Sequence, residues 1–465
     1  MSAWRPDIAG RAGPKYEAIA DVIAEDVATG RLGIGTRLPT HRDLAWHLGV
    51  TVGTVSRAYA EAERRGLVAG HVGRGTFVQE PAGSRADFHF ETSFLEQDAG
   101  PINMSFNFPA PGEEIAAIGP TLGALSRDPM VGVLVGYQSH EGLPGQRAAG
   151  ARWLARCGVQ TTQDRVILTA GAHNGMSVVL TALTQPGDRM VTDELTYPGI
   201  QPLTRSCGVR LDPLAMDGDG ILPEAFEAAC RQGDLRALYT VPTFQNPTNI
   251  VMPLERRQQI AGIASQHQVA IIEDDIFSPL IDNPPPPLTS LAPDVGYYIA
   301  SLSKALAPGL RIAYVTGPEG STALLARATR ISCWMASPLS GEIAARWIMD
   351  GTGDRILASR RVESEKRRQI ALAKFDGFDF DCPKGAMHVW LRLPEPWRSS
   401  EFVAEARRRG VLVTPADVFV VGRGATPHAV RICLGPPRQI ETVEAGLAVI
   451  ASLLTEGPVA VTEIV

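Results

Sequence analysis

The feature that most constrains the fold of this chain is a series of short apolar runs between residues 165 and 317. Each run is followed by polar residues and by a stretch with helical spacing. The runs are Val166–Leu168, Met190–Val191, Ala237–Tyr239, Val269–Ile272, Tyr298–Ile299 and Ile312–Val315. Such runs are typical of strands that are buried on both faces of a mostly parallel sheet, with helices covering it. The sequence therefore predicts an α/β body.

A smaller unit is expected after this body. Residues 319–374 have helical periodicity, and three further apolar runs surround a predicted helix over 399–410. These runs are Met387–Leu393, Val411–Val413 and Val430–Leu434. The mixture predicts a small α+β end domain over about 375–455, beside a large part over about 130–335.

The first 80 residues have a different organisation. Apolar positions recur at helical spacing, and capping or helix-breaking residues separate three expected helices, over 15–30, 40–49 and 51–66. Two short apolar runs joined by Gly73-Arg74-Gly75 then predict a β-hairpin. Three helices and a hairpin form a winged helix-turn-helix. The predicted domains are therefore a winged helix over 12–80, a linker over 81–101 and a body over 102–465.

The composition excludes several classes of protein. With 465 residues, of which 45% are hydrophobic and 20% charged, the chain is long enough for more than one globular domain. No apolar run is long enough to span a membrane, and no apolar stretch follows the N-terminal charges, so we expect a cytoplasmic protein without a membrane partner. The 6 cysteines form no CxxC pattern, so we expect neither a metal site nor a disulfide framework.

The N-terminal segment resembles the GntR family of bacterial winged-helix regulators. The matching motifs are Leu38–Ala45, Gly49–Thr51, Thr54–Val55, Ala58–Tyr59 and Gly73–Val78. A double-stranded DNA operator is therefore the implied partner, with the third helix in the major groove. The residues implied to contact DNA are Arg42, Thr51, Thr54, Arg57, His71 and Arg74. Members commonly carry an arginine two residues after the position of Val50, where this chain has Val52-Gly53, so one frequent contact is absent.

In the body, Ser301-Leu302-Ser303-Lys304 follows an expected strand, and Arg311 comes seven residues after the lysine. A primary amine can hold an aldehyde as a Schiff base, and hydroxyls and a guanidinium suit a phosphate dianion. A single lysine is usually a surface charge. A lysine that closes an apolar strand, with serines before it and an arginine after it, instead indicates a covalent binding site.

The body resembles the fold type I aminotransferases, which use pyridoxal 5'-phosphate. The resemblance implies that the cofactor forms its Schiff base with Lys304, the catalytic residue. The other residues implied to bind the cofactor are Gly171, Ala172, His173, Tyr197, Asn246, Asp274, Phe277, Ser301, Ser303 and Arg311, with Tyr137 reaching the phosphate of a partner subunit. Arg431 matches the arginine that binds a substrate carboxylate.

Asp274 is implied to pair with the ring nitrogen of the cofactor. It lies at the end of an apolar run, where an unpaired buried carboxylate would be costly. Glu273 and Asp275 flank it and are alternative assignments. Two nearby residues differ from the family pattern. Phe277 replaces a tyrosine that donates to O3' of the ring, and Asn249 replaces a glycine. The lost hydroxyl predicts weak or vestigial transaminase activity.

Together the two resemblances identify the chain as a member of the MocR subfamily of GntR-type regulators. This implies a transcription factor whose body senses pyridoxal phosphate, or an amine or amino acid that reacts with it at Lys304. The alternatives are an active aminotransferase with an accessory DNA-binding domain and a vitamin B6 sensor with no amino acid ligand. The subfamily pairs head to tail as a homodimer, and the resemblance implies the same here.

Overall fold

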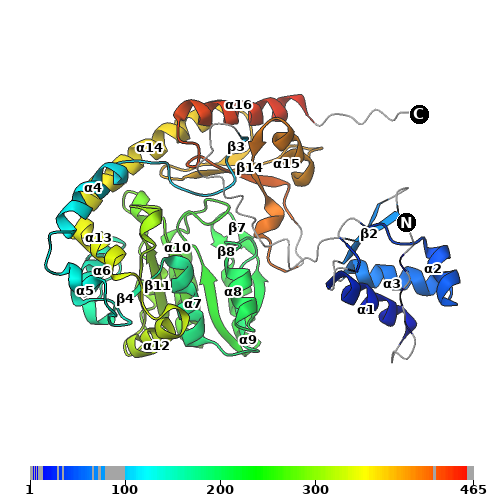
Figure 1. Cartoon of the computed structure of the whole chain (residues 1–465), viewed down its shortest axis with the longest axis horizontal. Coiled ribbons are helices and arrows are strands. Elements are labelled where there is room, and N and C mark those ends of the chain that lie inside the picture. Colours follow the sequence, from blue (N-terminus) through cyan, green and yellow to red (C-terminus); the bar gives the residue numbers. More distant parts are fainter. Residues whose placement is uncertain are drawn as a thin grey trace. The chain divides into compact units, whose positions relative to one another are not determined.

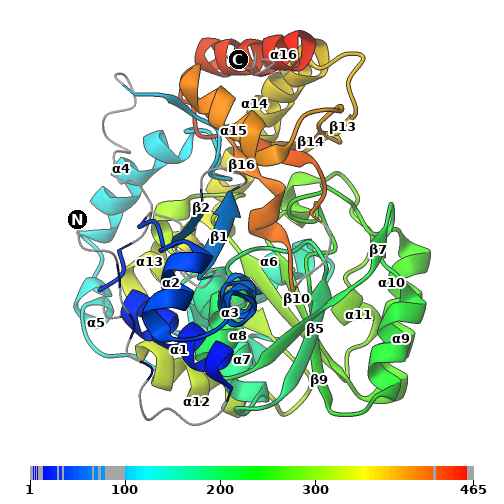
Figure 2. The ribbon, with the colours of Figure 1, turned by 90° about the vertical axis from the view of Figure 1, so that its right-hand side faces the viewer.

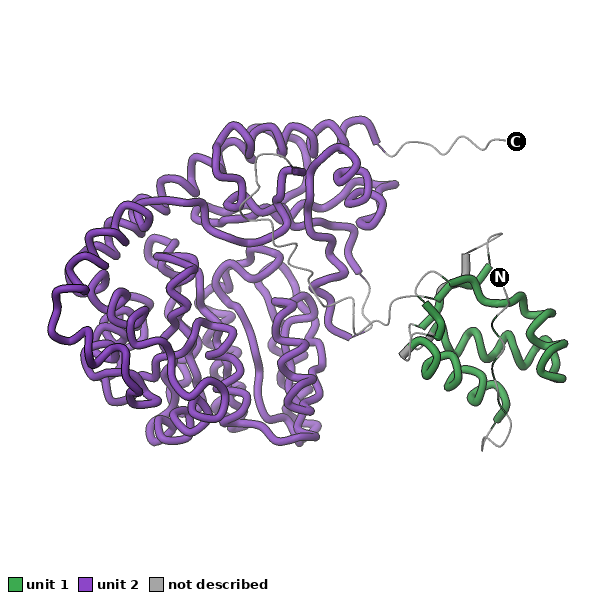
Figure 3. Tube along the Cα trace, viewed as in Figure 1, with its two compact units in different colours: residues 1–92 green, residues 93–465 purple. Residues whose placement is uncertain are grey.

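The protein divides into two compact units, Met1–Thr92 and Ser93–Val465, which Figure 3 colours separately. The computed structural model describes residues 14–28, 31–33, 36–64, 67–71, 75–78, 100–422 and 426–457, together with Trp4, Pro6 and Ile8. Most of the linker predicted over 81–101 lies outside the described residues. Each unit has its own hydrophobic core.

The first unit contains three helices and a two-stranded antiparallel sheet, in the predicted order. These elements are α1 (Lys15–Ala28), α2 (His41–Leu48), α3 (Val52–Arg64), β1 (Val68–His71) and β2 (Gly75–Val78). The core joins the helices through buried side chains such as Ile19, Leu44 and Val55. The predicted winged helix-turn-helix is confirmed.

The turn between α2 and α3 follows from two capping residues. The side chain of Thr40 accepts a hydrogen bond from the backbone N–H of Asp43 at 3.2 Å and so caps the first turn of α2. Gly49 ends the same helix in the left-handed conformation, with φ of 60°. The chain can therefore turn within the three residues Gly49, Val50 and Thr51 and begin α3.

The second unit contains a seven-stranded sheet in the order β4-β12-β11-β10-β9-β5-β6. The strands are β4 (Ile167–Thr169), β5 (Arg189–Asp193), β6 (Arg210–Leu214), β9 (Leu235–Thr240), β10 (Ala270–Asp275), β11 (Gly296–Ser301) and β12 (Ala313–Thr316). Within this sheet, β12 alone runs antiparallel to its neighbours. The predicted mostly parallel sheet is confirmed. The edge strand β6 was not predicted, because its exposed and half-buried residues form no continuous apolar run.

Helices cover both faces of this sheet (Figures 1 and 2). Neighbouring residues of β10 show the arrangement, because Ile271 belongs to an apolar cluster with Ile260 of α10, whereas Ile272 belongs to another cluster with Val179 of α7. The helices of this unit up to residue 374 are α4 (Glu114–Leu125), α5 (Val131–Leu134), α6 (Pro144–Arg156), α7 (Ala172–Leu183), α8 (Ile200–Ser206), α9 (Pro223–Arg231), α10 (Leu254–His267), α11 (Leu288–Leu291), α12 (Thr322–Cys333), α13 (Pro338–Met349) and α14 (Thr352–Lys374). A small hairpin, β7 (Met216–Asp217) and β8 (Gly220–Ile221), precedes α9.

The end domain contains a four-stranded antiparallel sheet in the order β13-β14-β17-β16. Its elements are β13 (Phe380–Asp381), β14 (His388–Arg392), α15 (Ser399–Arg408), β16 (Thr414–Pro415), β17 (Ala429–Cys433) and α16 (Ile440–Glu456), the last of which crosses the top of Figure 1. The strand predicted at Val411–Val413 appears as β15 (Val411–Leu412), but it does not join this sheet. It pairs in parallel with β3 (Ile102–Asn103), so the beginning of the body is attached to the end domain.

Of the helices in the described ranges, none is both long and apolar enough to cross a lipid bilayer. No three His, Cys, Asp or Glu side chains of these same residues gather as metal ligands would.

Candidate functional site

Lys304 lies three residues after β11, at the carboxyl edge of the seven-stranded sheet. Its Nζ donates a hydrogen bond to the backbone oxygen of Asn107 and lies 5.6 Å from the ring centre of Phe108. Burial lowers the pKa of Lys304 to about 8, and the nearby guanidinium groups of Arg431 and Arg311 act in the same direction. The amine is therefore unprotonated far more often near neutral pH than that of an ordinary lysine.

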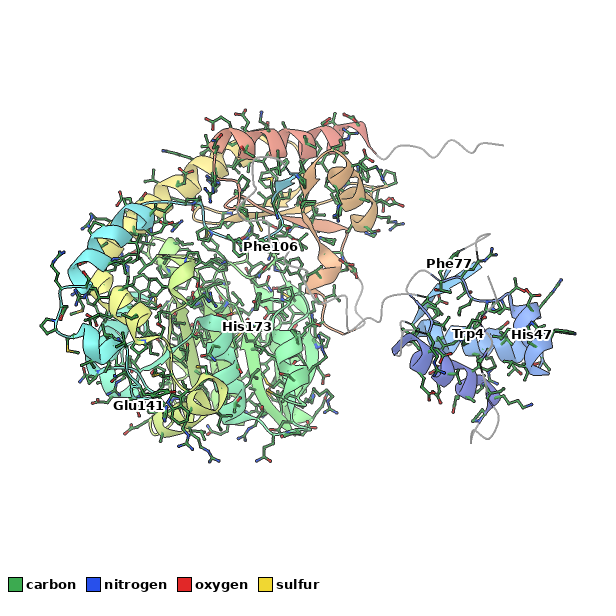
Figure 4. The ribbon with its side chains drawn as sticks, in the orientation of Figure 1. Trp4, His47, Phe77, Phe106, Glu141 and His173 are labelled. Atoms are coloured by element: carbon green, nitrogen blue, oxygen red, sulfur yellow. The ribbon has the colours of Figure 1, made fainter. Side chains whose placement is uncertain are left out.

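The segment that touches Lys304 precedes α4 in the chain. It includes Phe106, which Figure 4 labels where the large sheet meets the elements of the end domain. The rings of Phe106 and Phe108 stack, with centres 5.5 Å apart and an interplanar angle of 17°. No sequence pattern indicated this contact, since the segment and Lys304 are almost 200 residues apart.

Asp274, on β10, is close enough to Lys304 for the charge of that lysine to act on it. Burial raises the pKa of Asp274 to about 7, whereas the hydroxyl of Tyr239 and the charge of Lys304 favour the ionised form. Tyr239 donates to Oδ2 at 2.9 Å. The other oxygen, Oδ1, is buried and has no hydrogen-bond partner within the described ranges.

The two neighbouring acids have structural partners instead. Glu273 accepts hydrogen bonds from the backbone N–H groups of Leu288 and Thr289 and lies 3.6 Å from the guanidinium of Arg257. Asp275 accepts a hydrogen bond from the hydroxyl of Tyr298 at 2.7 Å. Of the three carboxylates, Asp274 is thus the one with an oxygen left for a ligand.

The beginning of α7 forms a site for an anion. Gly171 precedes this helix with φ of 85° and ψ of 170°, and the backbone N–H groups of the first turn have no partners within the helix. The guanidinium of Arg311 packs against Gly171, since a Cβ there would lie 2.5 Å from Nη2. Nη1 of Arg311 lies 3.5 Å from the hydroxyl of Ser303. Helix dipole, guanidinium and hydroxyl together suit a phosphate group.

Two further predicted residues stand beside this anion site. The hydroxyl of Ser301 accepts a hydrogen bond from the backbone N–H of Ser303 at 3.1 Å, which shapes the turn before Lys304. His173 follows Ala172 in the first turn of α7 (Figure 4). Burial and the charge of Arg311 lower the pKa of His173 and so favour its neutral ring.

Arg431, on β17 of the end domain, is hydrogen-bonded to Asn246. Its Nη1 donates to Oδ1 of Asn246 at 2.7 Å, and Nη2 donates to the backbone oxygen of Ser105 at 2.9 Å. The guanidinium carbon lies 4.8 Å from the ring centre of Phe419. Nε is buried and has no hydrogen-bond partner among the residues that the structure describes.

Tyr197 is half buried, and its ring packs so closely on Gly199 that a Cβ at that glycine would lie 2.4 Å from Cε1. Burial raises the pKa of Tyr197, and the charge of Asp274 raises it further. Phe277 is fully buried, with its ring edge-on to that of Phe244 at 6.3 Å.

Tyr137 does not join the cluster within one chain. Its side chain is 85% exposed, and its ring contacts that of Trp334 at 6.1 Å. Asn249, the second departure from the family pattern, has φ of 64°, which asparagine tolerates better than most residues that are not glycine. Its side chain donates to the backbone oxygens of Asp381 and His388 and so connects the segment between β9 and α10 with the four-stranded sheet.

In the first unit, the residues predicted to contact DNA are only partly described. Arg42 is exposed on α2, and the hydroxyls of Thr51 and Thr54 lie 2.9 Å apart at the beginning of α3. The guanidinium carbon of Arg57 lies 4.2 Å from the ring centre of Tyr16, a cation–π contact that the sequence did not indicate. Arg74 and the side chain of His71 lie outside the described residues.

Comparison with known proteins agrees with the two units. Residues 15–78 match the bacterial regulatory proteins of the gntR family, and residues 130–450 match aminotransferase class I and II. The fold and the site thus define a helix-turn-helix regulator with an aminotransferase-like body. The chain belongs to the MocR subfamily of GntR-type transcriptional regulators.

Two relatives and one solved structure illustrate this membership. The chain is 32% identical to the HTH-type transcriptional regulator YdeF of Bacillus subtilis, over 98% of this chain and 97% of the relative. It is 26% identical to the vitamin B6 salvage pathway transcriptional repressor PtsJ of Salmonella typhimurium, over 91% and 94%. The crystal structure of the α-aminoadipate aminotransferase LysN from Thermus thermophilus has the same fold, with a TM-score of 0.70, 22% identity, and 80% of this chain and 97% of that chain covered.

Proposed function

We propose that this regulator binds pyridoxal 5'-phosphate at Lys304 and that the cofactor, or an amine or amino acid that reacts with it, controls the affinity of the first unit for operator DNA. The observation that carries the proposal is the pairing of two groups at one sheet edge. Lys304 is an amine with a lowered pKa, and Asp274 has a buried carboxylate oxygen without a partner among the described residues.

The residues at this edge fit the cofactor. A protonated ring nitrogen is a donor that would satisfy Oδ1 of Asp274, which otherwise carries the cost of an unpaired buried polar atom. The absent Cβ of Gly171 leaves room for the Arg311 guanidinium beside the first turn of α7, where a phosphate would bind. Two relatives support the same ligand: LysN was crystallised with N-(5'-phosphopyridoxyl)-L-leucine, and PtsJ is named for vitamin B6 salvage.

When bound, pyridoxal phosphate supplies an aldehyde that condenses with primary amines and a pyridinium ring that withdraws electrons. Lys304 contributes an amine that loses its proton readily because its pKa is lowered to about 8. Asp274 holds the proton on the ring nitrogen, and Arg311 with Ser303 and the start of α7 binds the phosphate. Arg431 offers its Nε, which has no partner among the described residues, to the carboxylate of an amino acid ligand.

The head-to-tail homodimer is part of the proposal. Exposed apolar side chains lie at and just before Tyr137 and Trp334, whose rings contact each other, and exposed surfaces of this kind commonly mark interfaces. They include Met130, Val133, Val135, Tyr137, Ile331 and Trp334. Sedimentation of the wild type and of a Val135→Asp variant tests the dimer, because a charge in the interface should shift the equilibrium towards monomers.

The test of the proposed function uses purified full-length protein. Borohydride treatment of the pyridoxal phosphate complex should fix the cofactor on Lys304, and Lys304→Ala should yield no fixed cofactor. A peptide map with the label on Lys366, Lys374 or Lys384 would refute the site.

Operator binding is then titrated at fixed salt with and without a saturating amino acid that shifts the cofactor spectrum. A coupling of about 1 to 3 kcal/mol changes the affinity roughly 5- to 150-fold.

The second candidate function is an active aminotransferase. It is favoured by the presence of Lys304, Asp274 and Arg431 and disfavoured by Phe277, which has no hydroxyl to offer. Turnover with an amino acid and 2-oxoglutarate distinguishes the two. A regulator should show little or no turnover under conditions in which its DNA affinity still responds to the ligand.

A further inference from the structure

Tyr239 and Asp274 lie on neighbouring parallel strands. Tyr239 is level with Ile272 in the register of β9 and β10, so Asp274 stands two residues further along β10 and projects from the same face of the sheet as Ile272. The Tyr239 hydroxyl reaches Oδ2 of Asp274 at 2.9 Å, and both side chains are buried. No other side chain in the described part of the protein bonds to this carboxylate.

This hydrogen bond determines which oxygen of the Asp274 carboxylate can accept a hydrogen bond from a ligand. A carboxylate whose oxygens are both untied can rotate about its terminal torsion, which is broad and roughly two-fold. The bond from Tyr239 occupies Oδ2 and leaves Oδ1 as the acceptor for a ligand. A donor to the charged form also stabilises that form against the effect of burial.

We propose that Tyr239 is a positioning residue, which holds Asp274 in the orientation that the ring nitrogen of pyridoxal phosphate requires. The inference rests on the proposed function, because it assumes that the cofactor binds at Lys304. The competing explanation is that Tyr239 only fills the core, where its ring is completely buried.

The same sheet contains a matched control. Tyr298, on β11, is also completely buried and donates to Oδ2 of Asp275 at 2.7 Å. Asp275 projects from the opposite face of β10 to Asp274 and has further structural partners, such as the backbone N–H of Ser278. Tyr298→Phe therefore removes an equivalent tyrosine–aspartate bond that does not involve the ligand.

The experiment is a binding cycle on full-length protein. Affinities of the wild type, Tyr239→Phe and Tyr298→Phe are measured by absorbance titration with pyridoxal phosphate and with an analogue whose ring nitrogen is replaced by carbon. Thermal melting checks that each variant is folded. Tyr239→Phe should weaken binding of pyridoxal phosphate roughly tenfold or more, but binding of the analogue less than about threefold. Tyr298→Phe should change neither affinity more than about threefold.

Each of the following outcomes would contradict the proposed role of Tyr239. Equal weakening of both ligands by Tyr239→Phe would mean that the tyrosine acts through packing alone, and no weakening of either would mean that Asp274 needs no support. Equal effects of Tyr239→Phe and Tyr298→Phe on pyridoxal phosphate would also overturn the inference. A wild type that binds neither ligand would refute the proposed function itself, and the inference with it.

Discussion

Three consecutive carboxylates on β10 differ in their partners because successive side chains of a strand project from opposite faces of the sheet. Glu273 and Asp275 are held by backbone N–H groups and by hydroxyl or guanidinium groups. Asp274 has a single hydrogen bond, from Tyr239, and is otherwise unsupported among the described residues. At the scale of the residue, the ligand site therefore contains a carboxylate that the fold alone does not stabilise.

Asp274→Asn is expected to raise the free energy of unfolding of the cofactor-free protein by roughly 1 to 3 kcal/mol at about pH 8. Burial raises the pKa of Asp274 in the folded protein from an ordinary value of 3.8 to about 7. Ionisation of this group therefore opposes folding increasingly as the pH rises from about 4 to about 7. The gain should be nearly absent at about pH 4 and complete above about pH 7, which urea unfolding at the two pH values measures.

Asp275→Asn is the control for this prediction. It weakens the hydrogen bonds that the carboxylate accepts from Tyr298 and Ser278, so it should lower the free energy of unfolding at both pH values. A stabilisation by Asp274→Asn that is the same at both pH values would contradict the assignment of a raised pKa.

Lys304 should capture pyridoxal phosphate at a rate that rises with pH and becomes constant above about pH 8. The unprotonated amine is the nucleophile, and burial lowers the pKa of Lys304 from 10.5 to about 8. Stopped-flow absorbance with the cofactor-free protein measures the rate. Lys304→Arg should show no capture, and a rate that still rose at about pH 10 would mean that the amine is not buried.

Sequence patterns predicted the residues of this site whose chemistry is distinctive, such as Lys304 and Arg311, and left the choice among Glu273, Asp274 and Asp275 open. They gave no indication of Tyr239, because a tyrosine inside an apolar run is an ordinary core residue until the register between strands is known. The role of the backbone oxygens of Ser105 and Asn107 was equally hidden, since any residue type supplies a carbonyl group.

At the scale of the element, the phosphate-binding part of the proposed site depends on how α7 begins. Gly171 has φ of 85° and ψ of 170°, a combination that is essentially restricted to glycine. Its missing side chain also lets Arg311 approach the first turn of the helix. Arg311 itself has φ of 53° at the end of a short turn over Pro308–Leu310, so two unusual backbone conformations meet at this point.

Gly171→Ala is expected to weaken binding of pyridoxal phosphate by at least about tenfold, because the new Cβ displaces Arg311 and strains the backbone. Gly187→Ala is the matched control. Gly187 also has a positive φ, of 96°, but nothing lies within 4 Å of its Cβ position. Both variants should lose about 1 kcal/mol or more of stability from backbone strain, and titration should show weaker cofactor binding for Gly171→Ala alone.

Elements with a continuous apolar run were predicted, whereas elements defined by distant pairing were not. The edge strand β6 contains Asp212 and Pro213 and pairs only with β5, so its sequence lacks the usual strand signal. The pairing of β3 with β15 joins residues about 300 positions apart, and nothing in either dipeptide indicates its partner. The winged helix was the easiest element group to predict, because its contacts are local.

At the scale of the whole molecule, the two units have separate cores, and the protein is expected to unfold in two transitions. Calorimetry should show that pyridoxal phosphate raises the temperature of one transition only, by an amount equivalent to about 2.7 kcal/mol at a free concentration of 100 Kd. That transition belongs to the second unit, which contains Lys304.

Two matched variants assign the transitions. Leu44→Ala removes a completely buried leucine from the first unit, and Leu180→Ala removes one from the second. Each should destabilise its own unit by about 2 to 5 kcal/mol and leave the other transition in place. A single transition that both variants lower equally would show that the units fold as one.

The attachment of β3 to the end domain also determines how mechanical tension would travel through the chain. Residues 100–101 lie immediately before β3, whose Ile102 donates its N–H to Gly410, while Met104 bonds to Leu412 on β15 and to Cys433 on β17. A pull on the chain from its N-terminal side therefore loads β15 and β17 in shear before it reaches any strand of the seven-stranded sheet. Since β17 carries Arg431, the residue proposed to bind a ligand carboxylate lies on a strand that is bonded directly to the segment under tension, through Cys433 and Met104.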